Sequence, residues 1–142
     1  MTIGQPTQLV HPSARIHPSA SLHPTAIVGA LSVIGEGARL LPYSVVGEQT
    51  TLGAGCVVHS FAVVGGEPQD RRATATNTGT LVCGARNVFR EGVTVSRGTE
   101  HGGGETLIGD GNLFMAHSHV AHDARVGSDC TLANGVSLAG HV

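Results

Sequence analysis

The sequence contains few of the large side chains from which most hydrophobic cores are built. Its 142 residues include no tryptophan, one tyrosine and three phenylalanines, whereas 21 are glycine. Because aromatic side chains supply much of the buried area in ordinary cores, such a core is excluded and aliphatic side chains must do the packing. The length suits a single domain over residues 1–142, with residues 1–9 as a lead-in.

Basic residues are also scarce, and lysine is absent. With a formal net charge of −2 and no basic tract, the chain lacks the electrostatic signature of a nucleic-acid-binding protein or of a protein that binds anionic membranes. No apolar run approaches the roughly 20 residues of a membrane span, and the N-terminal residues lack the order of a signal peptide. These features predict a cytoplasmic protein whose arginines lie mostly at the surface, where some could dock an acidic partner.

The three cysteines, Cys56, Cys83 and Cys130, are too few and too widely spaced to form a typical zinc or redox motif. An odd number without a C-x-x-C pair indicates reduced thiols that act as small buried residues. We therefore expect no metal site built on cysteine and no disulfide framework.

The most informative positive feature is a six-residue repeat. An aliphatic residue recurs ten times in succession, with a small residue four positions later in most repeats. The aliphatic positions are Val10, Ile16, Leu22, Val28, Ile34, Leu40, Val46, Leu52, Val58 and Val64. A hexapeptide is too short to bury anything alone, so the repeats must stack into a solenoid with a continuous aliphatic interior. The sequence therefore predicts an all-β protein, a parallel β-helix.

The repeat resumes twice after interruptions at about 66–81 and 101–107. The interior positions of the resumed repeats are Cys83, Phe89 and Val95, and then Ile108, Phe114, Val120, Val126, Leu132 and Leu138. With three hexapeptides per coil, the repeats amount to about six coils. The interruptions are expected to protrude as two loops, and loops on a rigid scaffold commonly carry function.

Histidine is an informative residue in this sequence, with nine copies against one tyrosine, and two groups of histidines stand out. His11, His17 and His23 each precede proline in the first repeats, where solvated turns are the expected role. Near the C-terminus, residues 18 apart should occupy equivalent places on neighbouring coils, about 4.8 Å apart. Gly140 should then lie over His122, and His141 over Asp123.

This second arrangement suits direct acyl transfer. An imidazole can remove the proton from an attacking hydroxyl because its pKa lies near neutral pH, so His122 is the expected general base and Asp123 its orienting partner. A glycine N–H can closely approach a developing oxyanion, which is the role expected of Gly140. No serine or cysteine nucleophile has an obvious base partner, so we expect no acyl-enzyme. A solvated polar face of a β-helix would give the same spacing, and this alternative stays open.

Several segments resemble the hexapeptide acyltransferase superfamily and, within it, the UDP-N-acetylglucosamine O-acyltransferases of lipid A biosynthesis. The C-terminal segments that carry the resemblance are SHVAHD at 118–123, LANG at 132–135 and LAGHV at 138–142. The segments around the interruptions are GGEPQD at 65–70, RNVFRE at 86–91, and VTVSRGT at 93–99 followed by GGG at 102–104. The resemblance covers about residues 10–142 in order.

The resemblance implies a left-handed winding and a homotrimer with active sites between subunits. It also implies transfer of a 3-hydroxyacyl group from acyl carrier protein to the glucosamine 3-hydroxyl of UDP-N-acetylglucosamine, the first step of lipid A biosynthesis, without a cofactor or metal. His122, Asp123 and Gly140 would be the catalytic residues. The substrate-binding residues implied are Gln69, Asp70, Arg72, His119 and His141. Arg72 stands where the family usually has lysine, so the contact there should have a different geometry.

The family's later coils and C-terminal helical domain have no counterpart before the chain ends at Val142. We therefore expect this chain to be part of a longer protein, with weak activity or none by itself. An alternative is a non-catalytic trimeric β-helix that keeps only the residues closest to the substrate.

Two other enzymes share the repeat. One is a hexapeptide acyltransferase that uses an acyl-CoA donor. The other is a zinc carbonic anhydrase of the γ class, whose ligands resemble the spacing of His117 and His122. Catalytic zinc needs three protein ligands, and neither His59 nor His101 fits the third position, which argues against that class.

Overall fold

The computed structural model describes residues 9–142, so most of the expected lead-in lies outside the described residues. It contains eighteen short strands, β1 to β18, arranged in three six-stranded sheets. Sheet 1 contains β1 (Arg15–Ile16), β4 (Val33–Ile34), β7 (Thr50–Leu52), β10 (Thr80–Cys83), β13 (Glu105–Ile108) and β16 (Arg125–Val126). Sheet 2 contains β2 (Ser21–Leu22), β5 (Arg39–Leu40), β8 (Val57–Val58), β11 (Val88–Phe89), β14 (Leu113–Phe114) and β17 (Thr131–Leu132). Sheet 3 contains β3 (Ile27–Val28), β6 (Val45–Val46), β9 (Val63–Gly66), β12 (Thr94–Ser96), β15 (His119–Val120) and β18 (Ser137–Leu138).

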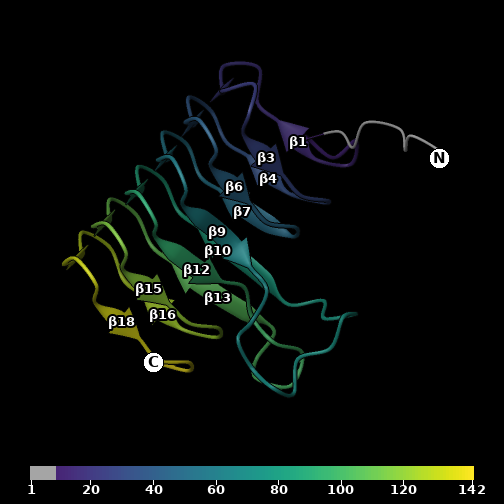
Figure 1. Cartoon of the computed structure of the whole chain (residues 1–142), viewed down its shortest axis with the longest axis vertical. Helices are drawn as coiled ribbons and strands as arrows, with labels where there is room; N and C mark the ends of the chain where they lie inside the picture. Colours follow the sequence, from purple (N-terminus) through teal and green to yellow (C-terminus); the bar gives the residue numbers. More distant parts are fainter. Residues whose placement is uncertain (1–8) are drawn as a thin grey trace, which may run out of the picture.

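Each strand pairs in parallel with the strand three positions later in the chain, so three strands complete one coil of a prism (Figure 1). Ile16 pairs with Ile34, and Val120 pairs with Leu138, both 18 residues apart. The predicted parallel β-helix of about six coils is confirmed. Within residues 9–142 no helix has the length and hydrophobicity needed to cross a membrane.

The interior of the prism is the aliphatic column that the repeat predicts. Its members from Val28 to Leu132 are buried, and the small residues that follow them, such as Ala38 and Ala62, are buried at the corners. Phe89 and Phe114 replace aliphatic residues on adjacent coils and stack with ring centroids 4.9 Å apart. Two of the three phenylalanines therefore pack against each other in the interior of the prism.

Both interruptions leave the prism at the same edge, between sheet 3 and sheet 1 (Figure 1). We call this edge, with residues 67–79, 97–104, 121–124 and 139–142, the loop corner. The segments between strands are 67–79 and 97–104 rather than the expected 66–81 and 101–107. The loops expected at about 66–81 and 101–107 overlap these segments, and Thr80 and Leu81 pair with Glu105 and Thr106, so β10 and β13 begin within the expected ranges.

The three His-Pro segments form one repeated turn, with one copy at each corner of the first coil. In the second copy, the Nδ1 atom of His17 lies 2.8 Å from the Ser19 hydroxyl and accepts the Ser19 N–H at 3.2 Å. The same hydroxyl accepts the N–H of Gly37 on the next coil at 3.0 Å. His11 with Ser13 and His23 with Thr25 repeat these contacts. These histidines are exposed and link each turn to the coil above it.

Candidate active site

The candidate site lies at the loop corner, where a turn of the fifth coil meets both loops. His122 and Asp123 occupy the turn between β15 (sheet 3) and β16 (sheet 1). Asp123 adopts a positive φ of 59°, which an aspartate tolerates better than most side chains. This turn conformation places both side chains outside the aliphatic column.

His122 and Asp123 form a hydrogen-bonded pair, with His122 Nδ1 2.8 Å from Asp123 Oδ2. Thr99 in the second loop donates its N–H to Asp123 Oδ1 at 3.0 Å and its hydroxyl to Oδ2 at 2.7 Å. The Asp123 N–H in turn donates to the Thr106 hydroxyl at 2.8 Å. Since a carboxylate accepts the proton at Nδ1, the Nε2 atom of His122 is left free to act as a base.

Asp123 is buried within the chain. Only 8% of the residue is exposed, because the second loop folds over it. Burial opposes ionisation of Asp123, but the hydrogen bonds from His122 and Thr99 outweigh it and lower the pKa of the carboxyl below its usual range. The ionised aspartate therefore holds the imidazole ring in place.

Gly140 and His141 lie one coil above the pair, as the 18-residue spacing predicts. His141 donates its N–H to the carbonyl of His122 at 3.1 Å, and the two imidazole rings meet edge to face with centroids 5.1 Å apart. A Cβ at Gly140 would lie 2.9 Å from Cε1 of His122, so any larger residue would displace the ring. Among residues 9–142 the Gly140 N–H has no hydrogen-bond acceptor, which leaves it available to a substrate oxygen.

Asp70 reaches the site from the first loop. Its Oδ2 lies 3.9 Å from Nε2 of His122 and 3.1 Å from Nε2 of His101. The Arg72 side chain, the Arg72 N–H and then His101 lower the pKa of Asp70 well below its usual range, although partial burial opposes them. A negative charge therefore faces the free nitrogen of the candidate base.

Arg72, the residue at the family's lysine position, is engaged within the chain. Its guanidinium donates to both carboxylate oxygens of Asp70, from Nε at 3.2 Å and from Nη2 at 2.9 Å. Lysine could not form this two-point contact. Gln69 is exposed beside this ion pair, so it and Asp70 can both face a substrate at the loop corner.

His119 occupies a separate position on the outer face of β15. Its Nδ1 atom lies 2.7 Å from the Thr94 hydroxyl on β12, which fixes the ring on sheet 3. The loop corner thus brings together His122, Asp123, Gly140, His141 and Asp70, and His119 lies on the adjoining sheet.

Two residues of the site had no predicted role. Thr99 lies in the motif at 93–99, yet nothing in its spacing showed that it would reach Asp123. His101 was considered only as a zinc ligand, whereas it contacts Asp70. Both contacts depend on loop conformation, which a repeat pattern does not encode.

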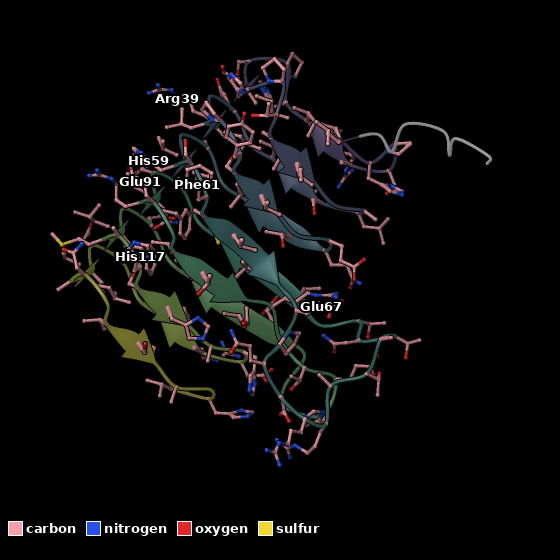
Figure 2. The ribbon with its side chains drawn as sticks, viewed as in Figure 1. Arg39, His59, Phe61, Glu67, Glu91 and His117 are labelled. Carbon is pink, nitrogen blue, oxygen red and sulfur yellow. The ribbon has the colours of Figure 1, made fainter. Side chains whose placement is uncertain are left out.

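His122, Asp123 and His141 also place one potential metal-ligand atom each within 4.8 Å of one another. Both oxygens of Asp123 already accept charge-assisted hydrogen bonds from within the chain, Oδ1 from Thr99 and Oδ2 from Thr99 and His122. His117 lies at the other end of β15 and is exposed, on the side of the prism away from Glu67 and the loops (Figure 2). Within one chain it therefore lies away from His122.

The cysteines are free thiols, and they offer no nucleophile to this site. Cys56 and Cys83 are buried, and burial raises the pKa of both thiols. Cys130 is partly exposed, contrary to the expectation that all three are buried.

Comparison with known proteins assigns the family. Residues 31–66 and 105–140, about half of the chain, match the bacterial transferase hexapeptide family (six repeats). The chain therefore belongs to the bacterial hexapeptide-repeat transferases.

Within this family the chain is similar to one kind of enzyme. It is 56% identical over 77 residues, which are 54% of this chain and 29% of the relative, to the acyl-[acyl-carrier-protein]–UDP-N-acetylglucosamine O-acyltransferase of Stenotrophomonas maltophilia. The structure resembles the UDP-N-acetylglucosamine acyltransferase of Francisella novicida, with a TM-score of 0.79, 32% identity and coverage of 93% of this chain and 50% of that one. The Arabidopsis enzyme gives a TM-score of 0.79, 30% identity and coverage of 94% and 56%.

The chain thus spans about half the length of the solved relatives that it matches. The agreement in fold with these left-handed prisms confirms the winding expected from the resemblance.

Proposed function

We propose that this chain contains the acyl-transfer site of an acyl-carrier-protein-dependent UDP-N-acetylglucosamine O-acyltransferase of lipid A biosynthesis. The observation that carries the proposal is the His122–Asp123 pair, whose free Nε2 lies beside Gly140 and Asp70. The similarity to enzymes of this name supports the choice of substrates.

In the proposed reaction, Nε2 of His122 takes the proton from the glucosamine 3-hydroxyl as its oxygen attacks the thioester carbonyl of the 3-hydroxyacyl donor. Asp123 stabilises the imidazolium, and the Gly140 N–H stabilises the oxyanion on the former carbonyl oxygen. Collapse of the tetrahedral intermediate forms the ester and breaks the carbon–sulfur bond. The carrier thiolate then takes the proton from His122, which restores the base.

Most of the other candidate residues are proposed to bind substrate. Asp70 would accept a hydrogen bond from a sugar hydroxyl held near His122, while Gln69, His119 and His141 would contact the sugar nucleotide or the acyl chain. Arg72 would act by holding Asp70, since its guanidinium is already paired. The reaction needs acyl carrier protein as donor partner and no cofactor. We also propose a homotrimer with sites between subunits, acting in the cytoplasm.

The test is a transfer assay with 3-hydroxyacyl carrier protein and UDP-N-acetylglucosamine. The chain would be assayed alone and joined to the later coils of the Stenotrophomonas maltophilia relative, each with its His122→Ala variant. Transfer that disappears in His122→Ala supports the proposal. Transfer only in the joined form would show that the chain contains the site but is inactive without the later coils. Transfer from an acyl-CoA but not from the carrier protein, or no transfer in either form, overturns the proposal.

A further inference from the structure

Asn77, in the first loop, is a buried amide whose polar atoms are all engaged. Only 6% of the residue is exposed. Its Nδ2 donates to the Gly98 carbonyl at 2.9 Å, and its Oδ1 accepts the N–H groups of Glu100 at 3.1 Å and Gly79 at 3.3 Å. One side chain therefore joins the first loop to the second through both a donor and an acceptor.

Arg97 fixes this junction to the prism. It was expected at the surface like the other arginines, but its side chain is only 2% exposed. The guanidinium donates from Nη1 to the Asn77 carbonyl at 3.1 Å and from Nη2 to the Glu48 carboxylate, which lies two coils earlier in the prism. A buried cation needs such partners, so the position of Asn77 is set by the prism and not by the loop alone.

Thr99 lies between Gly98 and Glu100, the two residues of the second loop that Asn77 binds. Thr99 itself donates two hydrogen bonds to Asp123. A continuous series of contacts thus runs from Asn77 through 98–100 to Asp123 and on to His122. A shift of about 1 Å in a catalytic group can lower a rate by about 10²-fold, so the conformation of this loop matters for the reaction.

We propose that Asn77 is a positioning residue that fixes Thr99, and through it the His122–Asp123 pair, in the orientation needed for proton transfer. This inference rests on the proposed function for its kinetic consequence, but its structural consequence is independent of any activity. The hydrogen bonds of the Asn77 side chain go to Gly98, Gly79 and Glu100 and not to the pair, so its effect on the pair passes through Thr99.

The most informative variant is Asn77→Asp, which has nearly the same shape. It retains an oxygen to accept the N–H groups of Gly79 and Glu100, but its second oxygen would face the Gly98 carbonyl without a proton to donate. The matched control is Thr76→Ala in the same loop, because the exposed Thr76 hydroxyl contacts only the Thr74 hydroxyl, at 3.1 Å.

Two readouts are needed. The first is kcat and KM for acyl transfer by the active form of the protein. The second is the NMR resonance of the His122 Nδ1 proton, assigned by its loss in His122→Ala, which reports the hydrogen bond to Asp123 without turnover. We expect Asn77→Asp to lower kcat by about 10- to 100-fold with little change in KM, and to shift or broaden this resonance. Thr76→Ala should change neither.

If kcat or the His122 resonance stays unchanged in a folded Asn77→Asp variant, the inference is overturned while the proposed function stands. If the unsubstituted protein shows no transfer, the proposed function fails and the resonance alone decides the inference. Should Asn77→Asp not fold, Asn77→Ala replaces it, because that change removes the side-chain contacts with Gly98, Gly79 and Glu100 without adding a charge. It should move the same resonance, and an unmoved resonance would overturn the inference.

Discussion

The histidines of the first coil and those of the loop corner have the same side chain, but the hydrogen bonds of their imidazole rings differ. The Nδ1 atom of His17 contacts the hydroxyl and the backbone N–H of Ser19, two residues later, so the ring stabilises the turn in which it lies. At His122, Nδ1 meets a carboxylate that is anchored by a loop from another coil, and Nε2 is left facing Asp70 and Gly140. What distinguishes a structural histidine from a candidate base here is the partner of Nδ1, because only a buried carboxylate stabilises a positive charge on the ring.

The largest effect should come from removing the base at the loop corner. We expect His122→Ala to lower kcat for acyl transfer by about 10²- to 10⁴-fold, the usual contribution of general-base catalysis. The measurement is steady-state transfer by the active form of the protein. His117→Ala, which removes an exposed histidine from the opposite end of the same strand, is the control and should retain activity. An equal loss of kcat in both variants would contradict the assignment of His122 as the general base.

Removing the carboxylate should make His122 more like the histidines of the first coil. We expect Asp123→Asn to reduce kcat on the order of 10²-fold, because the amide cannot stabilise the imidazolium. The same change should lower the free energy of unfolding at pH 7 by about 1–3 kcal/mol, since Thr99 and His122 lose a charged acceptor.

The stability effect of Asp123→Asn should depend on pH in a defined direction. The pKa of Asp123 is lowered on folding, so the ionised carboxylate stabilises the folded state above the unfolded-state pKa of about 4. This contribution disappears as the pH falls through the folded-state value. Chemical denaturation of both proteins between pH 7 and pH 3 should therefore show a difference that is full at pH 7 and shrinks below about pH 4. A difference that grows on acidification would contradict the assignment.

A smaller effect is expected from crowding the ring of His122 without removing any polar group. The added Cβ in Gly140→Ala would lie 2.9 Å from Cε1 of His122 and must displace it. We expect kcat to fall by about 10-fold, because the base moves relative to the attacking hydroxyl. Gly135→Ala is the control for replacing a glycine in the same coil. A Cβ at Gly135 meets nothing within 4 Å, so this change should not lower kcat. Because Gly135 has a φ of 71°, the comparison should rest on kcat measured well below the unfolding temperature of both variants.

The smallest effect should come from the turns of the first coil. Ser19→Ala removes the hydroxyl that contacts His17 and Gly37, which should lower the free energy of unfolding by about 0.5–1 kcal/mol and leave transfer unchanged. Ser21→Ala, an exposed position on β2, is the matched control for the denaturation measurement. A loss of transfer in Ser19→Ala would mean that the first coil is coupled to the site.

The sequence predicts the prism well because its determinants are local and repeated. Every member of the aliphatic series from Val28 onward packs toward the axis, and the 18-residue spacing places Gly140 against His122. It predicts the loops less well, since the buried positions of Arg97 and Asn77 depend on partners 20 or more residues away. The same limit applies to Thr99, whose contact with Asp123 arises from how one loop folds onto another coil.

The two ends of each loop lie on adjacent rungs of the prism, which has a consequence for how such a fold can diversify. β9 and β10, which flank the first loop, join ladders that continue without a gap, as do β12 and β13 around the second. A segment of different length or sequence can therefore be exchanged at this corner while the inherited coils keep their stacking. Selection for a new substrate can act on about twenty residues and leave the framework that folds them untouched.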